Sequence, residues 1–354
     1  MKNRRQLYFL FAPIATFVIA SLLFVKFVTS VTRSVQVAKS EIYLIGLRDE
    51  TTVGCSNLDG TDLDYLVIGD SHTYSSFDFV TFTRLVQTQK IGVCTLGGFY
   101  FESMLMLLQS AEPTFINTKT VIYGLSYRQF TGGDNKEKQL EAHEKVISAI
   151  AEQSQPNFIL LNARVTDFLS QNKSTKRLHD YRESLLKWTP IIQNLDEQKA
   201  TRLFTEIQND NSKSWQRYLQ VAQLNPRFNE MAQQFCDFVT KHDLNLILVD
   251  IPESPHLSRL YSIQQKQQYD QVKAELQKCA KRFFAKDNFT EANQNKYFVN
   301  RFLTDDWIDG YATWNFKSEK QINNLYDSDH LNLIGAQVFT HKMVSLLNSQ
   351  LENH

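Results

Sequence analysis

Residues 65–78 read YLVIGDSHTYSSFD, and this stretch decides how the chain is interpreted. A short, continuous apolar run ends in Gly69 and Asp70, and Ser71 and His72 follow at once. Such a run is typical of a strand that is buried on both faces of a parallel sheet. Ser71 is then either a nucleophile at the end of a buried strand or a small residue tolerated in a tight turn.

Three more apolar runs have the same character and also stop at small or polar residues. They are KIGVCTLGG at 90–98, TKTVIYGLS at 118–126 and LNLILVDIPES at 244–254. Helical patterns lie between them, at 82–89, 101–111 and 228–242. This alternation predicts an α/β domain with a central, mainly parallel sheet. Residues 131–225 are polar and helix-rich, and we expect them to form a helical insertion in that domain.

Composition excludes several classes of protein. The 354 residues carry 38 basic and 38 acidic side chains without a block of like charge, so nucleic acid is not an expected partner. The four cysteines, Cys55, Cys94, Cys236 and Cys279, lack metal-ligand spacing, so zinc is not expected. We also expect no other metal and no cofactor. Cys236 and Cys279 lie in helical patterns and are either bridged or buried as free thiols.

The N-terminus predicts a membrane anchor. After a basic tail at 1–6, residues 7–25 read LYFLFAPIATFVIASLLFV, without a charge. A helix of this length covers roughly 28 Å, close to the thickness of a bilayer core. We expect a transmembrane anchor at 7–29, a juxtamembrane segment at 30–60 and one domain at 61–354. The alternatives are a cleaved signal peptide, although its apolar core is normally shorter, and a buried helix of a soluble domain.

Basic residues before the anchor predict its orientation. Lys2, Arg4 and Arg5 favour a cytoplasmic N-terminus, which places the domain outside the cytoplasm. The expected location is therefore the cytoplasmic (inner) membrane, crossed once, with an extracytoplasmic or periplasmic domain.

The C-terminal region supplies a partner for Ser71. The sequence DSDH at 327–330 precedes an amphipathic helical pattern for which Asn332 is a plausible N-cap. A serine hydroxyl needs a base, and the base needs an orienting acceptor. We assign these roles to His330 and Asp327, and give Asp329 a capping or solvated role.

The ends of the expected strands also supply candidate oxyanion donors. In doubly wound sheets, sites form at the carboxyl ends of the strands. The backbone amides of Ser71 and of Gly97 or Gly98 lie at such ends. They are suitable donors for the negative charge of a tetrahedral intermediate.

The ordered set of motifs resembles the SGNH, or GDSL-type, hydrolase superfamily. GDSH after the first run, a glycine pair after the second and DSDHLN before the last helix match its order over residues 61–354. The resemblance implies a three-layer sandwich with Ser71, Asp327 and His330 as catalytic residues. With the anchor, the chain is similar to bacterial proteins that O-acylate cell-surface polymers, such as those of alginate and peptidoglycan O-acetylation and of teichoic acid D-alanylation.

That resemblance implies partners and a function. Such proteins commonly work with a membrane-bound O-acyltransferase, and the expected ligands are an acyl donor and a cell-envelope glycan. The expected reaction is acyl transfer to this polysaccharide, with an ester hydrolase or a non-catalytic assembly or binding factor as alternatives. The chain departs from the family pattern at YGLSYRQF (123–130), where the usual oxyanion asparagine is missing. Either Ser126, Tyr127 or Arg128 replaces this donor, or the oxyanion hole has only two donors.

Four further residues are candidates for substrate binding. His72 adjoins the serine, and its alternative is packing behind the loop. Arg128 lies at a strand end, where it could bind an anionic glycan or phosphate or form a surface salt bridge. Trp307 and Trp314 precede the DSDH loop and could stack on sugar rings or anchor the loop.

Overall fold

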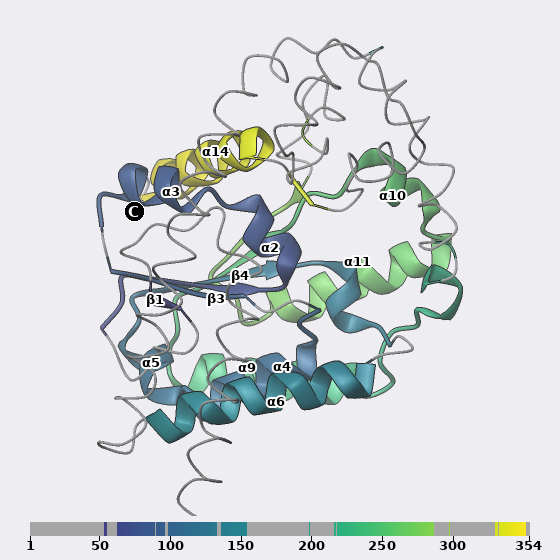
Figure 1. Cartoon of the computed structure of the whole chain (residues 1–354), viewed down its shortest axis with the longest axis horizontal. Helices are drawn as coiled ribbons and strands as arrows, with labels where there is room; N and C mark the ends of the chain where they lie inside the picture. Colours follow the sequence, from purple (N-terminus) through teal and green to yellow (C-terminus); the bar gives the residue numbers. More distant parts are fainter. Residues whose placement is uncertain are drawn as a thin grey trace, which may run out of the picture.

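A six-stranded parallel sheet forms the centre of the computed structural model (Figure 1). The structure describes residues 53–54, 62–88, 90–95, 98–132, 136–153, 198, 216, 218–286, 297, 330–331 and 333–351. The strands are β1 (Val53–Gly54), β2 (Tyr65–Gly69), β3 (Ile91–Thr95), β4 (Thr120–Leu125), β5 (Leu246–Asp250) and β6 (Arg282–Phe284). Their order across the sheet is β1-β3-β2-β4-β5-β6, and each neighbouring pair is parallel. The predicted α/β class is therefore confirmed.

The four apolar runs of the sequence form the four central strands, β2 to β5. In β2 the side chains of Leu66, Val67 and Ile68 are all buried, although successive residues point to opposite faces. Burial on both faces explains why these runs are continuous and do not alternate. The edge strands β1 and β6 were not predicted, because two and three residues are too few to show a pattern.

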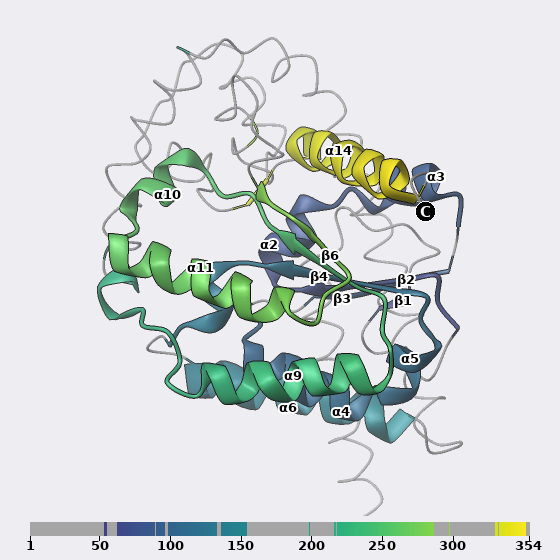
Figure 2. The ribbon, with the colours of Figure 1, turned by 180° about the vertical axis from the view of Figure 1, so that it is seen from behind.

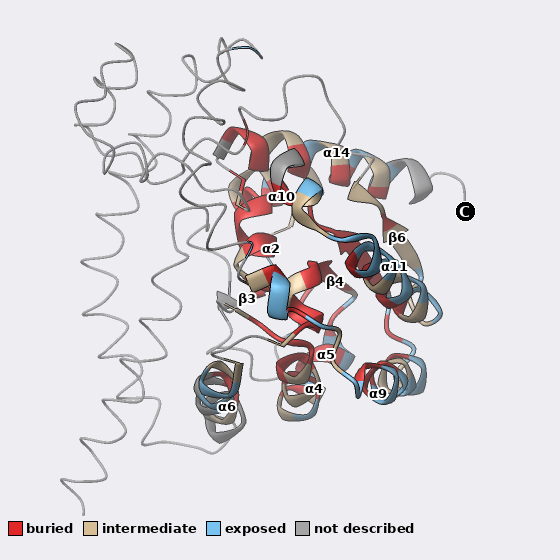
Figure 3. Ribbon diagram, turned by 90° about the vertical axis from the view of Figure 1, so that its right-hand side faces the viewer, coloured by how far each residue is buried: buried red, intermediate tan, exposed pale blue. Residues whose placement is uncertain are grey.

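Helices cover both faces of the sheet (Figures 1 and 2). One face is covered by α2 (Ser71–Ser76), α3 (Phe79–Val86) and α14 (Leu333–Leu351). The other face is covered by α4 (Phe101–Ser110), α5 (Glu112–Asn117), α6 (Lys136–Gln153), α9 (Phe228–Lys241) and α11 (Ile263–Gln277). The buried residues of these helices face the sheet and form one hydrophobic cluster on each side of it (Figure 3).

Two short helices follow the carboxyl ends of central strands. The 3₁₀ helix η3 (Tyr127–Phe130) comes one residue after β4, and α10 (Pro255–Leu260) comes shortly after β5. Because parallel strands all end at the same edge, these segments lie at the edge where sites form in such sheets.

The two ends of the expected helical insertion, near residues 131 and 225, lie side by side. Thr131 and Leu224 form an isolated antiparallel bridge, and the amide of Asn225 donates to the carbonyl of Phe130 over 3.0 Å. Within the insertion, α6 packs on α4 and buries Ile147. The chain therefore enters and leaves the segment 131–225 at two points that are adjacent in space.

None of the helices in the described ranges is long and apolar enough to cross a membrane. The anchor expected at 7–29 lies outside these ranges.

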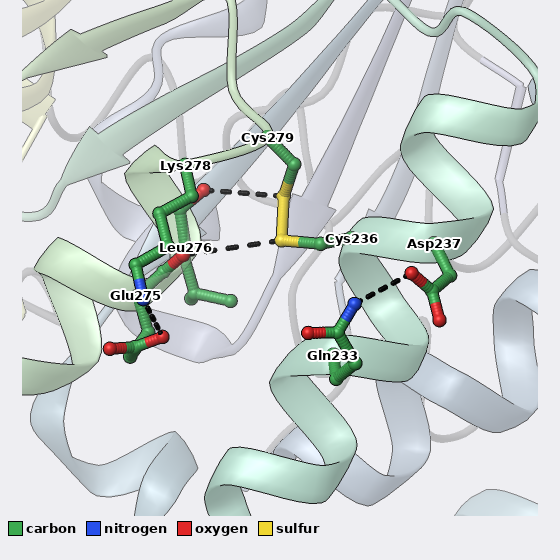
Figure 4. The surroundings of a disulfide bond; sticks show 7 residues. All are labelled: Gln233, Cys236, Asp237, Glu275, Leu276, Lys278 and Cys279. Atoms are coloured by element: carbon green, nitrogen blue, oxygen red, sulfur yellow. Dashed lines mark hydrogen bonds and ion pairs between the residues drawn. A yellow bond between two sulfur atoms is a disulfide. The ribbon is translucent and has the colours of Figure 1, made fainter.

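A disulfide joins α9 to the end of α11 (Figure 4). It links Cys236 and Cys279, whose Cα atoms are 5.2 Å apart and whose positions are 43 residues apart in sequence. Cys94 is disulfide-bonded as well. Of the two alternatives for Cys236 and Cys279, the structure thus selects the bridge over free thiols.

Removing this bridge is expected to cost about 2–4 kcal/mol of unfolding free energy, because the cross-link restricts the unfolded chain. The change is the double substitution Cys236→Ser and Cys279→Ser, measured by guanidinium denaturation under oxidising conditions. Gln234→Ser, exposed on the same helix, is the matched control. Equal midpoints for the double variant and wild type would contradict the prediction.

Candidate active site

Asp70 fixes the start of the short helix that carries Ser71. Its side chain caps α2, accepting hydrogen bonds from the amides of His72 at 3.0 Å and Thr73 at 3.1 Å. An aspartate that caps a helix in this way also stabilises the helix terminus electrostatically. The chain therefore turns directly from β2 into α2, and Ser71 becomes the first residue of the helix.

The second carboxylate oxygen of Asp70 also has partners. It accepts a hydrogen bond from the Ser126 hydroxyl at 2.5 Å and lies 3.2 Å from Nδ1 of His72. Burial alone would raise the pKa of this carboxyl group. The His72 imidazole, the Ser126 hydroxyl and the Thr73 amide outweigh burial and hold the pKa of Asp70 well below its usual range. Asp70 is therefore a buried, ionised carboxylate.

Two glycines allow α2 to lie close against the sheet. A Cβ atom at Gly69 or at Gly124 would collide with the side chain of Thr73. Gly69 also has a φ of +156°, which side chains rarely adopt. The Thr73 hydroxyl lies between the Asp70 carboxylate and the carbonyl of Gly124, at 3.4 and 3.3 Å. The helix that begins at Ser71 is thereby fixed to both β2 and β4.

The side chains of Ser71 and His330 are in contact near the carboxyl end of β2. Nε2 of His330 lies 2.9 Å from Oγ of Ser71, although the two residues are 259 positions apart in sequence. His330 shortly precedes α14, and α14 packs on α2 and α3. One polar contact of this packing runs from the Asp78 amide to the Thr340 hydroxyl, at 3.0 Å. The docking of the last helix therefore brings the imidazole to the serine.

His72 packs against the imidazole of His330. The ring centroids are 4.7 Å apart with an interplanar angle of 50°, and His72 is only 2% exposed. Its ring lies between Asp70 and His330, and the substrate contact stays a prediction. The alternative interpretation, packing behind the serine, describes its position.

The backbone amide of Ser71 has no hydrogen-bond partner among the described residues. Asp70 occupies the amides of His72 and Thr73, and within the described ranges the Ser71 amide makes no hydrogen bond. Ser71 itself is half-buried. Gly98 lies shortly after the end of β3, the strand next to β2, with a left-handed φ of +64°. Both predicted donors that the structure describes thus lie at the ends of neighbouring strands.

Of the three side chains considered for the third donor, two are engaged elsewhere. Ser126 uses its hydroxyl proton on Asp70. Tyr127 is 1% exposed and donates its hydroxyl to Oε1 of Gln268 at 3.0 Å. Arg128 is half-buried, with its guanidinium carbon 5.3 Å from the ring centre of Tyr218. Arg128 is therefore the one of the three whose side chain is partly exposed.

Several predicted site residues lie outside the described residues: Gly97, Asp327, Asp329, Trp307 and Trp314. No protein-family model matches the chain, and no curated protein matches its sequence.

Sequence reasoning missed the roles of Asp70 and Gly124. The signal for Asp70 was present, since aspartate directly before a new helical segment is a preferred N-cap. No comparable signal marks Gly124, because only the packing of Thr73 across two strands shows why a side chain is excluded there.

Proposed function

We propose that this chain is a membrane-anchored, extracytoplasmic serine O-acyltransferase of SGNH type that modifies a cell-envelope polysaccharide. The observation that carries the proposal is the 2.9 Å separation of Ser71 Oγ and His330 Nε2 at the carboxyl edge of a parallel sheet. A serine hydroxyl is activated by an adjacent base at this kind of distance.

The reaction has two balanced steps. In the first, His330 accepts the Ser71 proton while Oγ attacks the carbonyl of an acyl donor; the bond to the donor's leaving group breaks, and that group departs with the proton. In the second, His330 accepts the proton of a sugar hydroxyl, whose oxygen takes the acyl group, and Ser71 regains its proton. The Ser71 amide, with an amide near Gly98, is the proposed donor to the oxyanion in both steps.

The disulfides support placing the domain outside the cytoplasm. Cys236 and Cys279 are bridged and Cys94 is also disulfide-bonded. Stable disulfides are typical of the periplasm and the cell exterior and rare in the cytosol. They agree with the orientation that Lys2, Arg4 and Arg5 favour.

Polymer ester content tests the function and its alternatives together. In cells that produce Ser71→Ala at the wild-type level, we expect ester groups on the envelope polysaccharide to fall to the level of a deletion strain. A rise in ester content would instead support a hydrolase that removes such groups. Equal content in wild type, Ser71→Ala and deletion strains would contradict both enzymatic functions. Ser345→Ala, exposed on α14, controls for protein level and membrane insertion.

A further inference from the structure

A groove of about 380 Å³ lies between residues 216–223 and the N-terminal part of α11. This volume is near the lower end of the range for small-molecule sites, about 300–1,000 Å³. Six glutamines contribute to its wall: Gln216, Gln220, Gln223, Gln264, Gln265 and Gln268. Leu219, Ala222 and Leu260 add apolar surface, and no described lining residue carries a charge.

One of these glutamines holds the two walls together. Gln265 is 8% exposed and donates from Nε2 to the carbonyl of Leu219 at 2.6 Å. Its Oε1 accepts from the amide of Ser262 at 2.9 Å, as part of the capping box of α11. The groove is therefore built by a buried side chain that spans it and is not a chance gap between exposed helices.

The other amides are available to a ligand. Gln216, Gln220, Gln223 and Gln264 are exposed, and their side chains make no hydrogen bond to the described residues. A glutamine amide offers two N–H donors and an acceptor oxygen. A sugar hydroxyl likewise donates and accepts, whereas a carboxylate or phosphate only accepts. Without a cationic side chain among the described lining residues, an anion would find neutral amide donors there but no ion pair.

A chain of contacts links the groove to the serine. The Tyr127 hydroxyl donates to Gln268, which lines the groove. Tyr127 is the first residue of η3, and Ser126 is the N-cap of that helix. Ser126 in turn donates to Asp70, which caps the helix that begins at Ser71. Groove and serine therefore lie at the same edge of the sheet, joined through the end of β4.

We infer that this groove binds a neutral, hydroxyl-rich segment of the polysaccharide whose hydroxyl group meets Ser71. That this ligand is the acyl acceptor rests on the proposed function. That the groove binds it does not depend on the proposed function. Apolar side chains beside amides suit the C–H face and hydroxyl edge of an uncharged sugar. A glycan built from uronic acids or phosphodiesters is the wrong ligand for this lining.

Binding to an array of bacterial envelope glycans, neutral and anionic, tests the inference without turnover. Full-length protein in detergent carries Ser71→Ala in every sample. We expect selective binding to neutral glycans, and at least about tenfold weaker binding after Gln220→Ala with Gln264→Ala, the scale for losing two neutral hydrogen bonds. Gln267→Ala, exposed on α11 but outside the groove, is the matched control and should bind like the parent protein.

Three outcomes would overturn the inference: selective binding to anionic glycans, no binding at all, or neutral binding that the double variant leaves unchanged. Failure of the proposed function looks different. In that case Ser71→Ala leaves polymer ester content unchanged. Neutral glycans still bind, and the groove variants still weaken this binding.

Discussion

His330→Gln is expected to slow covalent labelling of the protein by a fluorophosphonate by about a thousandfold or more. The probe reacts with an activated serine, and a positioned base contributes about 10²–10⁴ in rate to such a step, besides holding the hydroxyl in place. Glutamine preserves much of the volume of histidine but cannot accept the Ser71 proton. The measurement is the labelling rate of purified, full-length protein at neutral pH.

Two matched variants make this result specific. His341→Gln changes an exposed histidine on α14 and should label at the wild-type rate. Ser71→Ala should not label at all. Labelling of Ser71→Ala, or equal rates for His330→Gln and wild type, would refute the assignment of nucleophile and base.

Asp70→Ala is expected to lower the free energy of unfolding by about 3–5 kcal/mol, on the scale for breaking a buried, paired charge. The substitution removes the N-cap of α2 and leaves the Ser126 hydroxyl and the His72 ring without their carboxylate. Denaturant unfolding followed by circular dichroism measures the loss. A change below about 1 kcal/mol, the scale of a cap alone, would contradict a stabilising role of the buried carboxylate beyond capping.

Asp70→Asn separates the charge from the cap, because asparagine caps helices about as well as aspartate. The pKa of Asp70 is lowered in the folded protein, so its stabilisation is present above the unfolded value near 3.9 and is lost as pH falls. Wild type should therefore lose its advantage over Asp70→Asn as pH drops below about 4. An advantage that is unchanged between pH 7 and pH 3 would show that the charge of Asp70 does not contribute.

The central fold could be predicted because burial dictates it locally. A strand covered on both faces must be apolar along its whole length, so β2 to β5 are visible in the sequence as continuous runs. Even Ser71 and His330 could be paired before their distance was known, because strand ends meet at one edge and the final helix has its own apolar pattern.

The remaining features depend on contacts between distant segments. That His72 lies behind the serine follows from its packing against His330, and the exclusion of side chains at Gly124 follows from Thr73. The engagement of the Ser126 hydroxyl by Asp70 joins residues 56 positions apart. Local sequence carries the residue types at these positions but not the partners that decide their roles.

The long sequence separation of Ser71 and His330 also determines when, during synthesis and folding, the pair can form. Contacts between residues 259 positions apart form only after the chain between them has been made, and long-range contacts of this kind form slowly. A chain that emerges from its N-terminus can therefore complete the serine–histidine pair only after the segment that carries His330 has been made. A chain truncated before His330 would carry the serine without its base.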